Sequence, residues 1–107
     1  MENQLTKVEE STMLILWRLR RAFVKDIIAH MNDPHPPYNT VSSVMRILVQ
    51  KGYVSYKAYG KTHEYFPLVS INTYRKTALQ WLIENYYQNS TEYFMENIKE
   101  ELNFKSL

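Results

Sequence analysis

The sequence predicts a mainly α-helical protein in which three helices precede a two-stranded β-hairpin and further helices follow it. Three observations lead to this prediction. Apolar residues recur with helical spacing over most of the chain, and they alternate with polar residues between positions 53 and 66. The two glycines of the 107-residue chain, Gly52 and Gly60, stand just before and in the middle of that alternating stretch. Glycine is favoured where the backbone needs a positive φ.

Composition and length indicate one small globular domain with an appended helical segment, at residues 1–69 and 70–107. Hydrophobic residues make up 45% of the chain and charged residues 22%, as in ordinary globular proteins. Apolar runs are far shorter than the ~18 residues of a membrane span. The chain has no cysteine, which excludes disulfides and thiolate metal sites. We expect a cytoplasmic protein.

The first two helices are delimited by local signals. Thr6 and Glu9 have the spacing of a capping box, so the first helix should begin there and run to about Leu19. A second, shorter amphipathic segment covers residues 24–31. The three prolines between positions 34 and 37 then end it.

The third helix is expected from Tyr38 to Lys51, and its two sides differ in chemistry. The side opposite the expected buried stripe carries short polar side chains and Arg46. Gly52 follows the helix, where a left-handed residue commonly ends it. The apolar positions i, i+3, i+4 and i+7 predict the buried stripe: Val41, Val44, Met45 and Leu48.

The alternating stretch predicts a hairpin, with strands at residues 53–59 and 61–66 and Gly60 in the turn. The region that contains the third helix and the hairpin is basic. Residues 38–67 carry four basic side chains and one acidic side chain, Glu64, although the net charge of the whole chain is only +2. This distribution indicates a polyanionic partner for one part of the chain.

Helical spacing returns after residue 70, with many aromatic side chains on the helices. The domain of about 67 residues that precedes this segment closes its own core, so an apolar face beyond it lacks a partner within the chain. We expect a second copy of the chain to cover this face. The predicted dimerisation residues are Tyr74, Trp81, Leu82, Tyr86, Phe94 and Ile98.

Three helices followed by a β-hairpin describe a winged helix-turn-helix. A helix that is buried on one stripe and polar on the other can enter the major groove of DNA, which is ~12 Å wide. Basic residues of the hairpin can contact phosphates. The residues predicted to bind DNA are Asn39, Thr40, Ser42, Ser43 and Arg46 on the third helix, Lys51 at its end, and Lys57, Lys61 and His63 on the hairpin.

Three segments resemble the penicillinase-repressor family of winged-helix regulators: LTKVEESTMLILWRL (5–19), YNTVSSVMRILVQKGYV (38–54) and YGKTHEYFPLVS (59–70). The resemblance implies a bacterial repressor that binds a dyad operator as a homodimer and dimerises through helices after the hairpin. It also implies a membrane-bound sensor protease as a partner, with no membrane insertion of this chain. A copper-responsive branch of the family releases DNA on binding metal.

The sequence departs from the family pattern in three places. Arg20-Arg21 stand where the family usually has Gly-Pro, and Ile47 stands where a second arginine of the recognition helix is usual. Five residues follow Leu102, where relatives usually continue into another helix. The paired cysteines of the copper-responsive branch are absent, so copper sensing is not expected.

Other functional classes have little support in the sequence. There is no Ser/His/Asp grouping, glycine-rich phosphate loop or His-x-x-Glu-His motif, so we expect neither an enzyme nor a cofactor. His30 and His35 have no third ligand nearby, so no metal site is predicted. One alternative stays open: a winged-helix module that binds proteins and has lost specific DNA binding. The low net charge and Ile47 favour it, and the polar third helix and the hairpin lysines oppose it.

Overall fold

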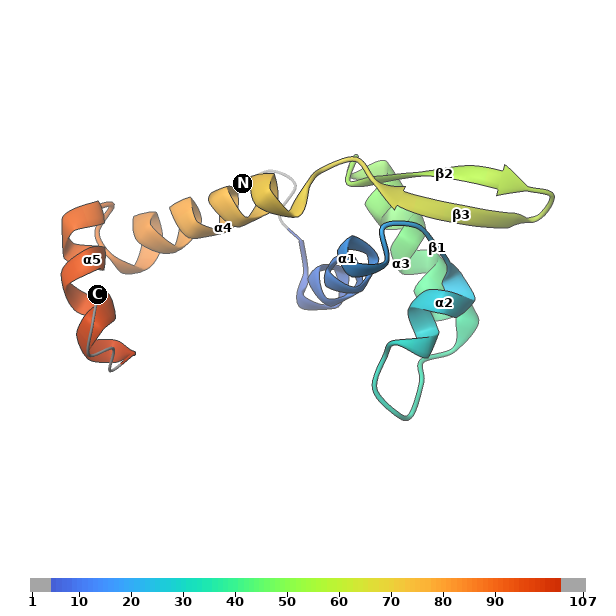
Figure 1. The fold of residues 1–107 in the computed structure, drawn as a ribbon, viewed down its shortest axis with the longest axis horizontal. Helices are drawn as coiled ribbons and strands as arrows, with labels where there is room; N and C mark the ends of the chain where they lie inside the picture. Colours follow the sequence, from blue (N-terminus) through green and yellow to red (C-terminus); the bar gives the residue numbers. More distant parts are fainter. Residues whose placement is uncertain (1–4, 103–107) are drawn as a thin grey trace. The chain divides into compact units, whose positions relative to one another are not determined.

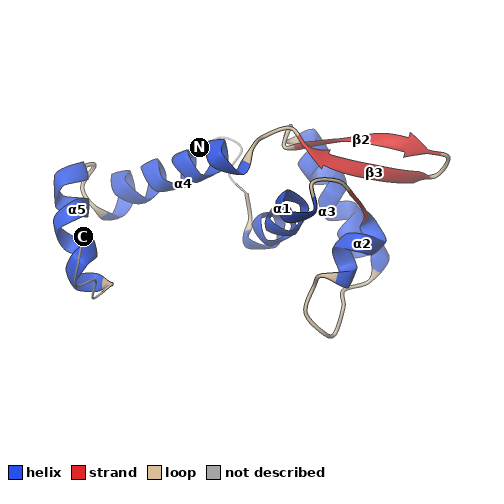
Figure 2. Ribbon diagram, viewed as in Figure 1, coloured by secondary structure: helices blue, strands red, loops and turns tan. Residues whose placement is uncertain are grey.

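The structure is a computed structural model that describes residues 5–102, and these residues form two compact units divided between Ile71 and Asn72. We describe each unit by itself. Figure 2 shows that the strands all belong to the N-terminal unit, while the C-terminal unit is helical.

The N-terminal unit confirms the predicted order of three helices followed by a hairpin (Figure 1). The capping box is present, because Thr6 accepts from the Glu9 backbone and Glu9 accepts from the Thr6 backbone. The glycines also behave as predicted, since φ is +80° at Gly52 and +64° at Gly60. The elements of this unit are α1 (Lys7–Leu19), β1 (Ala22–Phe23), α2 (Val24–Ala29), α3 (Tyr38–Gln50), β2 (Val54–Tyr59) and β3 (Thr62–Pro67).

The sheet has three antiparallel strands in the order β1-β3-β2, so the expectation of a two-stranded sheet was incomplete. The third strand, β1, pairs Ala22 with Tyr65 and Phe23 with Glu64. Two residues are too short to produce an alternating pattern, which is why the sequence did not indicate this strand. The β2–β3 hairpin, called the wing below, pairs Val54 with Pro67 at its base and Tyr59 with Thr62 at its tip.

The core of this unit lies where the three helices meet the base of the sheet. Its largest fully buried side chains include Met13 and Leu16 of α1, Ile27 of α2, and Met45 and Leu48 of α3. Val44 was predicted in the buried stripe but is only half-buried. It lies at the edge of that stripe, where α3, α1 and the loop around Pro36 border an apolar groove.

The C-terminal unit consists of α4 (Ile71–Tyr86) and α5 (Thr91–Glu101). Ser90 caps α5 by accepting a hydrogen bond from the Tyr93 backbone. Tyr87, in the turn between the helices, contacts Phe94 edge-on at 5.0 Å between ring centroids and donates a 2.7 Å hydrogen bond to Glu101. None of the α4 residues is buried, and Phe94 is the buried residue of α5. The unit therefore has little core of its own.

Candidate nucleic-acid interface

The packing of α3 determines which of its side chains face outward. Burial of the side that carries Val41, Met45 and Leu48 turns the opposite side to the surface. Exposed residues recur there at three- and four-residue spacing, which keeps them on one face of the helix. This outward face consists of Asn39, Ser43, Arg46, Ile47 and Gln50.

Two residues of α3 that were predicted to bind DNA lie beside the outward face. Ser42 is half-buried and turns toward the wing, where it lines a hollow. Thr40 is exposed but borders the apolar groove next to α1. Gln50 belongs to the polar side of this helix but was not among the residues predicted to bind DNA, although it is exposed two turns beyond Ser43. The i, i+7 spacing of Ser43 and Gln50 was the signal that could have identified it.

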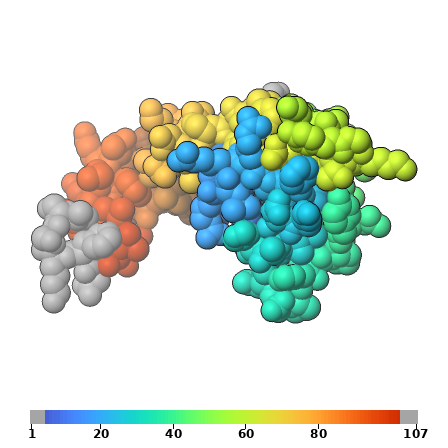
Figure 3. Space-filling model, turned by 45° about the vertical axis from the view of Figure 1, so that its right-hand side comes forward, coloured from blue at the N-terminus to red at the C-terminus, as the bar shows by residue number. Residues whose placement is uncertain are grey.

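The wing carries most of the remaining predicted contacts. Figures 1 and 3 show its far end extending past the helices of the N-terminal unit. Lys57 and Lys61 are exposed, and the Lys57 ammonium group lies 5.3 Å from the centroid of the Tyr59 ring. The only acidic residue of the wing, Glu64, faces Arg21 at 3.6 Å. This ion pair offsets the negative charge of Glu64, so the lysines dominate the charge of the wing.

A hollow of ≈ 350 Å³ separates the wing from α3. Tyr65 of β3 lines this hollow. Burial raises the pKa of the Tyr65 phenol, the neighbouring Tyr38 and Tyr56 raise it further, and the Arg46 guanidinium opposes them. Tyr65 is therefore neutral at physiological pH. The polar and basic residues that line the hollow are Tyr38, Ser42, Arg46 and Gln50 from α3 and Tyr56, Lys61, His63 and Tyr65 from the wing.

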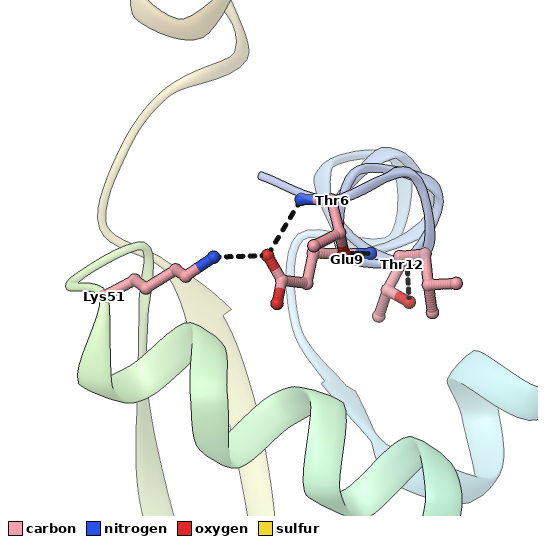
Figure 4. A network of polar contacts seen from close by, with 5 residues as sticks. Thr6, Glu9, Thr12 and Lys51 are labelled. Carbon is pink, nitrogen blue, oxygen red and sulfur yellow. Dashed lines mark hydrogen bonds and ion pairs between the residues drawn. The ribbon is translucent and has the colours of Figure 1, made fainter. Parts of the chain in front are cut away.

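Lys51 was predicted to contact DNA, but the structure gives its ammonium group a different role (Figure 4). Its Nζ lies 2.6 Å from Oε1 of Glu9, which also accepts a 3.0 Å hydrogen bond from the Thr6 backbone. Glu9 is buried, and burial raises the pKa of its carboxyl. The bonds from Lys51 and Thr6 outweigh that effect, so the pKa of Glu9 lies below 4.5. We therefore leave Lys51 out of the candidate interface.

The predicted dimerisation residues differ in exposure. Tyr74, Trp81, Leu82 and Ile98 are half-buried, and Tyr86 is 65% exposed with its ring against Trp81. Phe94 is an exception, because it is only 9% exposed and packs against Tyr87 within its own unit. Phe94 is therefore part of the small core between α4 and α5 and offers little surface to a partner.

A family model described as penicillinase repressor matches residues 5–106, nearly the whole chain. The chain belongs to the penicillinase repressor family. This confirms the resemblance that the sequence motifs indicated, and the helices and small sheet agree with the winged-helix fold of these regulators. No curated protein matches the chain significantly.

Within residues 5–102 of this penicillinase repressor family member, no three histidine, aspartate or glutamate side chains lie close enough together to hold a metal ion. None of the helices described is both long and apolar enough to cross a membrane.

Proposed function

We propose that this protein is a transcriptional repressor that binds duplex DNA as a homodimer, with α3 in the major groove and the wing on the phosphate backbone. The observation that carries the proposal is the outward face of α3. It exposes Asn39, Ser43, Arg46 and Gln50 beside a wing that exposes Lys57 and Lys61. Membership of a repressor family supports the same function.

The outward face of α3 has the chemistry of base recognition. An asparagine or glutamine amide can bind adenine through two hydrogen bonds, and an arginine can bind guanine in the same way. Asn39, Gln50 and Arg46 supply these groups, and short Ser43 lets the helix backbone come close to the bases. Ser43 donates its hydroxyl proton to the Asn39 carbonyl at 2.9 Å, so its oxygen is left to accept from a base.

The wing supplies the contacts that do not depend on sequence. Lys57 and Lys61 are exposed on the strand and turn that extend past the helices. Lysine side chains neutralise phosphates and release condensed counterions, which makes affinity strongly dependent on salt. Their positions on β2 and in the tight turn fix them relative to α3, so phosphate binding would also orient the recognition helix.

The homodimer is proposed from the composition of α4. Half-buried Tyr74, Trp81 and Leu82 share one face of a helix in which no residue is buried. Large aromatic side chains each bury ~150–250 Å² when covered, so a few of them can anchor an interface. A two-fold pairing would present two α3 helices to successive major grooves, ~34 Å apart.

A duplex titration at two salt concentrations tests the proposal. Each phosphate contact contributes about 0.9 to the slope of log K against log salt, so a DNA-binding protein should show a steep negative slope. The double variant Lys57→Gln/Lys61→Gln should have a much shallower slope. Its control is Lys99→Gln, which removes an exposed lysine of α5 and should leave the slope unchanged. No measurable duplex binding at low salt would favour the protein-interaction module instead.

A further inference from the structure

The hollow between α3 and the wing holds a histidine whose ring is fixed in place. The imidazole of His63 stacks in parallel on the ring of Tyr56, with 4.0 Å between centroids and 5° between planes. The Tyr65 ring meets it edge-on at 6.0 Å. His63 is half-exposed and lines the hollow, so its imidazole is accessible to a ligand there.

The charged side chains that line the hollow beside His63 are both positive: Arg46 of α3 and Lys61 of the turn. Tyr38 of α3, Tyr56 of β2 and Tyr65 of β3 also line it. α2 contributes only the apolar Val24. Within the described residues no carboxylate lines the hollow, since the neighbouring Glu64 faces Arg21.

An anion that enters the hollow favours a proton on His63. A phosphate diester between Arg46, Lys61 and His63 attracts the imidazolium and accepts its hydrogen bond. Histidine is the side chain whose ordinary titration range lies closest to physiological pH. Anion binding and proton uptake are therefore linked at this position.

We propose that the hollow is a binding site for a DNA backbone phosphate held by Lys61 and His63, and that each protomer takes up a proton at His63 when it binds DNA. This inference rests on the proposed function, and it adds a site and a regulation that DNA binding alone does not require. Arg46 strengthens the positive potential of the hollow from its α3 side. Affinity for DNA therefore rises as the pH falls toward 6.

The test is the affinity of the full-length protein for one duplex at constant ionic strength from pH 6 to 8. A fully linked proton changes affinity tenfold per pH unit for each protomer, so the wild-type affinity should fall severalfold or more over this range. His63→Gln keeps a polar side chain that cannot titrate, and its affinity should be nearly independent of pH. His63→Arg carries a permanent charge, and it should bind at pH 8 nearly as tightly as the wild type binds at pH 6.

The chain offers a matched control, because its other two histidines are His30 and His35. The double variant His30→Gln/His35→Gln should keep the wild-type pH profile. If the wild type binds DNA with a flat profile, or if His63→Gln keeps the wild-type slope, the inference is wrong while the proposed function stands. If no variant binds duplex at pH 6, both fail. Circular dichroism at each pH shows whether each variant is folded.

Discussion

The carboxylate of Glu9 joins the first turn of α1 to the end of α3. It accepts from the Thr6 backbone at 3.0 Å and from Lys51 Nζ at 2.6 Å while being largely removed from water. The capping part of this arrangement was predictable, because a capping box is local in sequence. The bond to Lys51 was not, because it joins residues 42 positions apart and depends on how α1 packs on α3.

The lowered pKa of Glu9 predicts how stability depends on pH. A carboxyl whose pKa is lower in the folded state stabilises the fold above its unfolded value, here 4.5, and this contribution is lost as the pH falls through the folded pKa. Glu9→Gln should therefore lower the free energy of unfolding most above about pH 5, and the difference from wild type should shrink at lower pH. Urea unfolding at pH 7 and pH 4 measures it. A difference that is equal at both pH values would contradict this account.

Removal of Lys51, the ion-pair partner of Glu9, should lower the stability of the fold for a different reason. Lys51→Met leaves the Glu9 carboxylate largely buried with fewer donors, which should cost about 1–3 kcal/mol of stability at pH 7. If Lys51 acts in the fold and not at the interface, the folded variant should bind duplex DNA with the wild-type dependence on salt. If the slope of log K against log salt were shallower by about one unit per protomer, Lys51 would instead be a DNA-contacting residue.

At the scale of elements, α3 and the wing divide the proposed recognition between them. The amphipathic pattern of α3 was sufficient to predict both its buried and its outward sides, because a single helix fixes those directions. It could not indicate which residues at the edges of the stripe would be covered. Val44, Thr40 and Ser42 lie at these edges, and the positions of α1 and the wing decide their surroundings. The strand β1 was not predicted for a similar reason, because it is defined by its pairing with β3, which lies far away in the sequence.

Arg46 is the α3 residue whose removal should affect sequence recognition most. Arg46→Ala should cost about 1–3 kcal/mol on a preferred operator and relax specificity at one base position of each half-site. Arg18→Ala, which removes an exposed arginine of α1, is the control. Competition between a preferred and a random duplex measures the effect. An equal loss on both duplexes would assign Arg46 to phosphate contact instead.

Lys61, in the turn of the wing, should contribute to DNA affinity regardless of the base sequence of the duplex. Lys61→Ala should weaken binding to all duplexes alike and make the slope of log K against log salt shallower by about one unit per protomer. The wild type and the variant are compared on two unrelated duplexes at three or more salt concentrations. A loss confined to one of the duplexes would mean that the tip of the wing reads bases.

At the scale of the whole molecule, α4 is the helix through which we propose that two protomers pair. The aromatic spacing beyond residue 70 was visible in the sequence, and it correctly indicated helices with few buried residues. Phe94 was misassigned because spacing alone cannot distinguish a contact with Tyr87 in the same unit from a contact with a second chain. The single chain also leaves Tyr86 65% exposed, although its ring lies against Trp81.

Charge on the apolar face of α4 should separate the protomers. The double variant Trp81→Glu/Leu82→Glu should sediment as a folded monomer at micromolar concentration, at which the wild type should sediment as a dimer. Gln80→Glu introduces the same charge at an exposed position of α4 and should stay dimeric. A wild-type chain that sediments as a 12.9 kDa monomer without DNA would contradict the proposed dimer.

The central claim is that a homodimer reads a dyad operator with α3. In vitro selection of a random duplex library by the purified full-length protein tests it most directly, because no operator needs to be known beforehand. The account predicts enrichment of an inverted repeat whose half-sites are centred about 10 base pairs, or a multiple of one helical turn, apart. Selection with Arg46→Ala should relax one position in each half-site. Failure to enrich any common sequence, or enrichment of a single unrepeated site, would contradict the account.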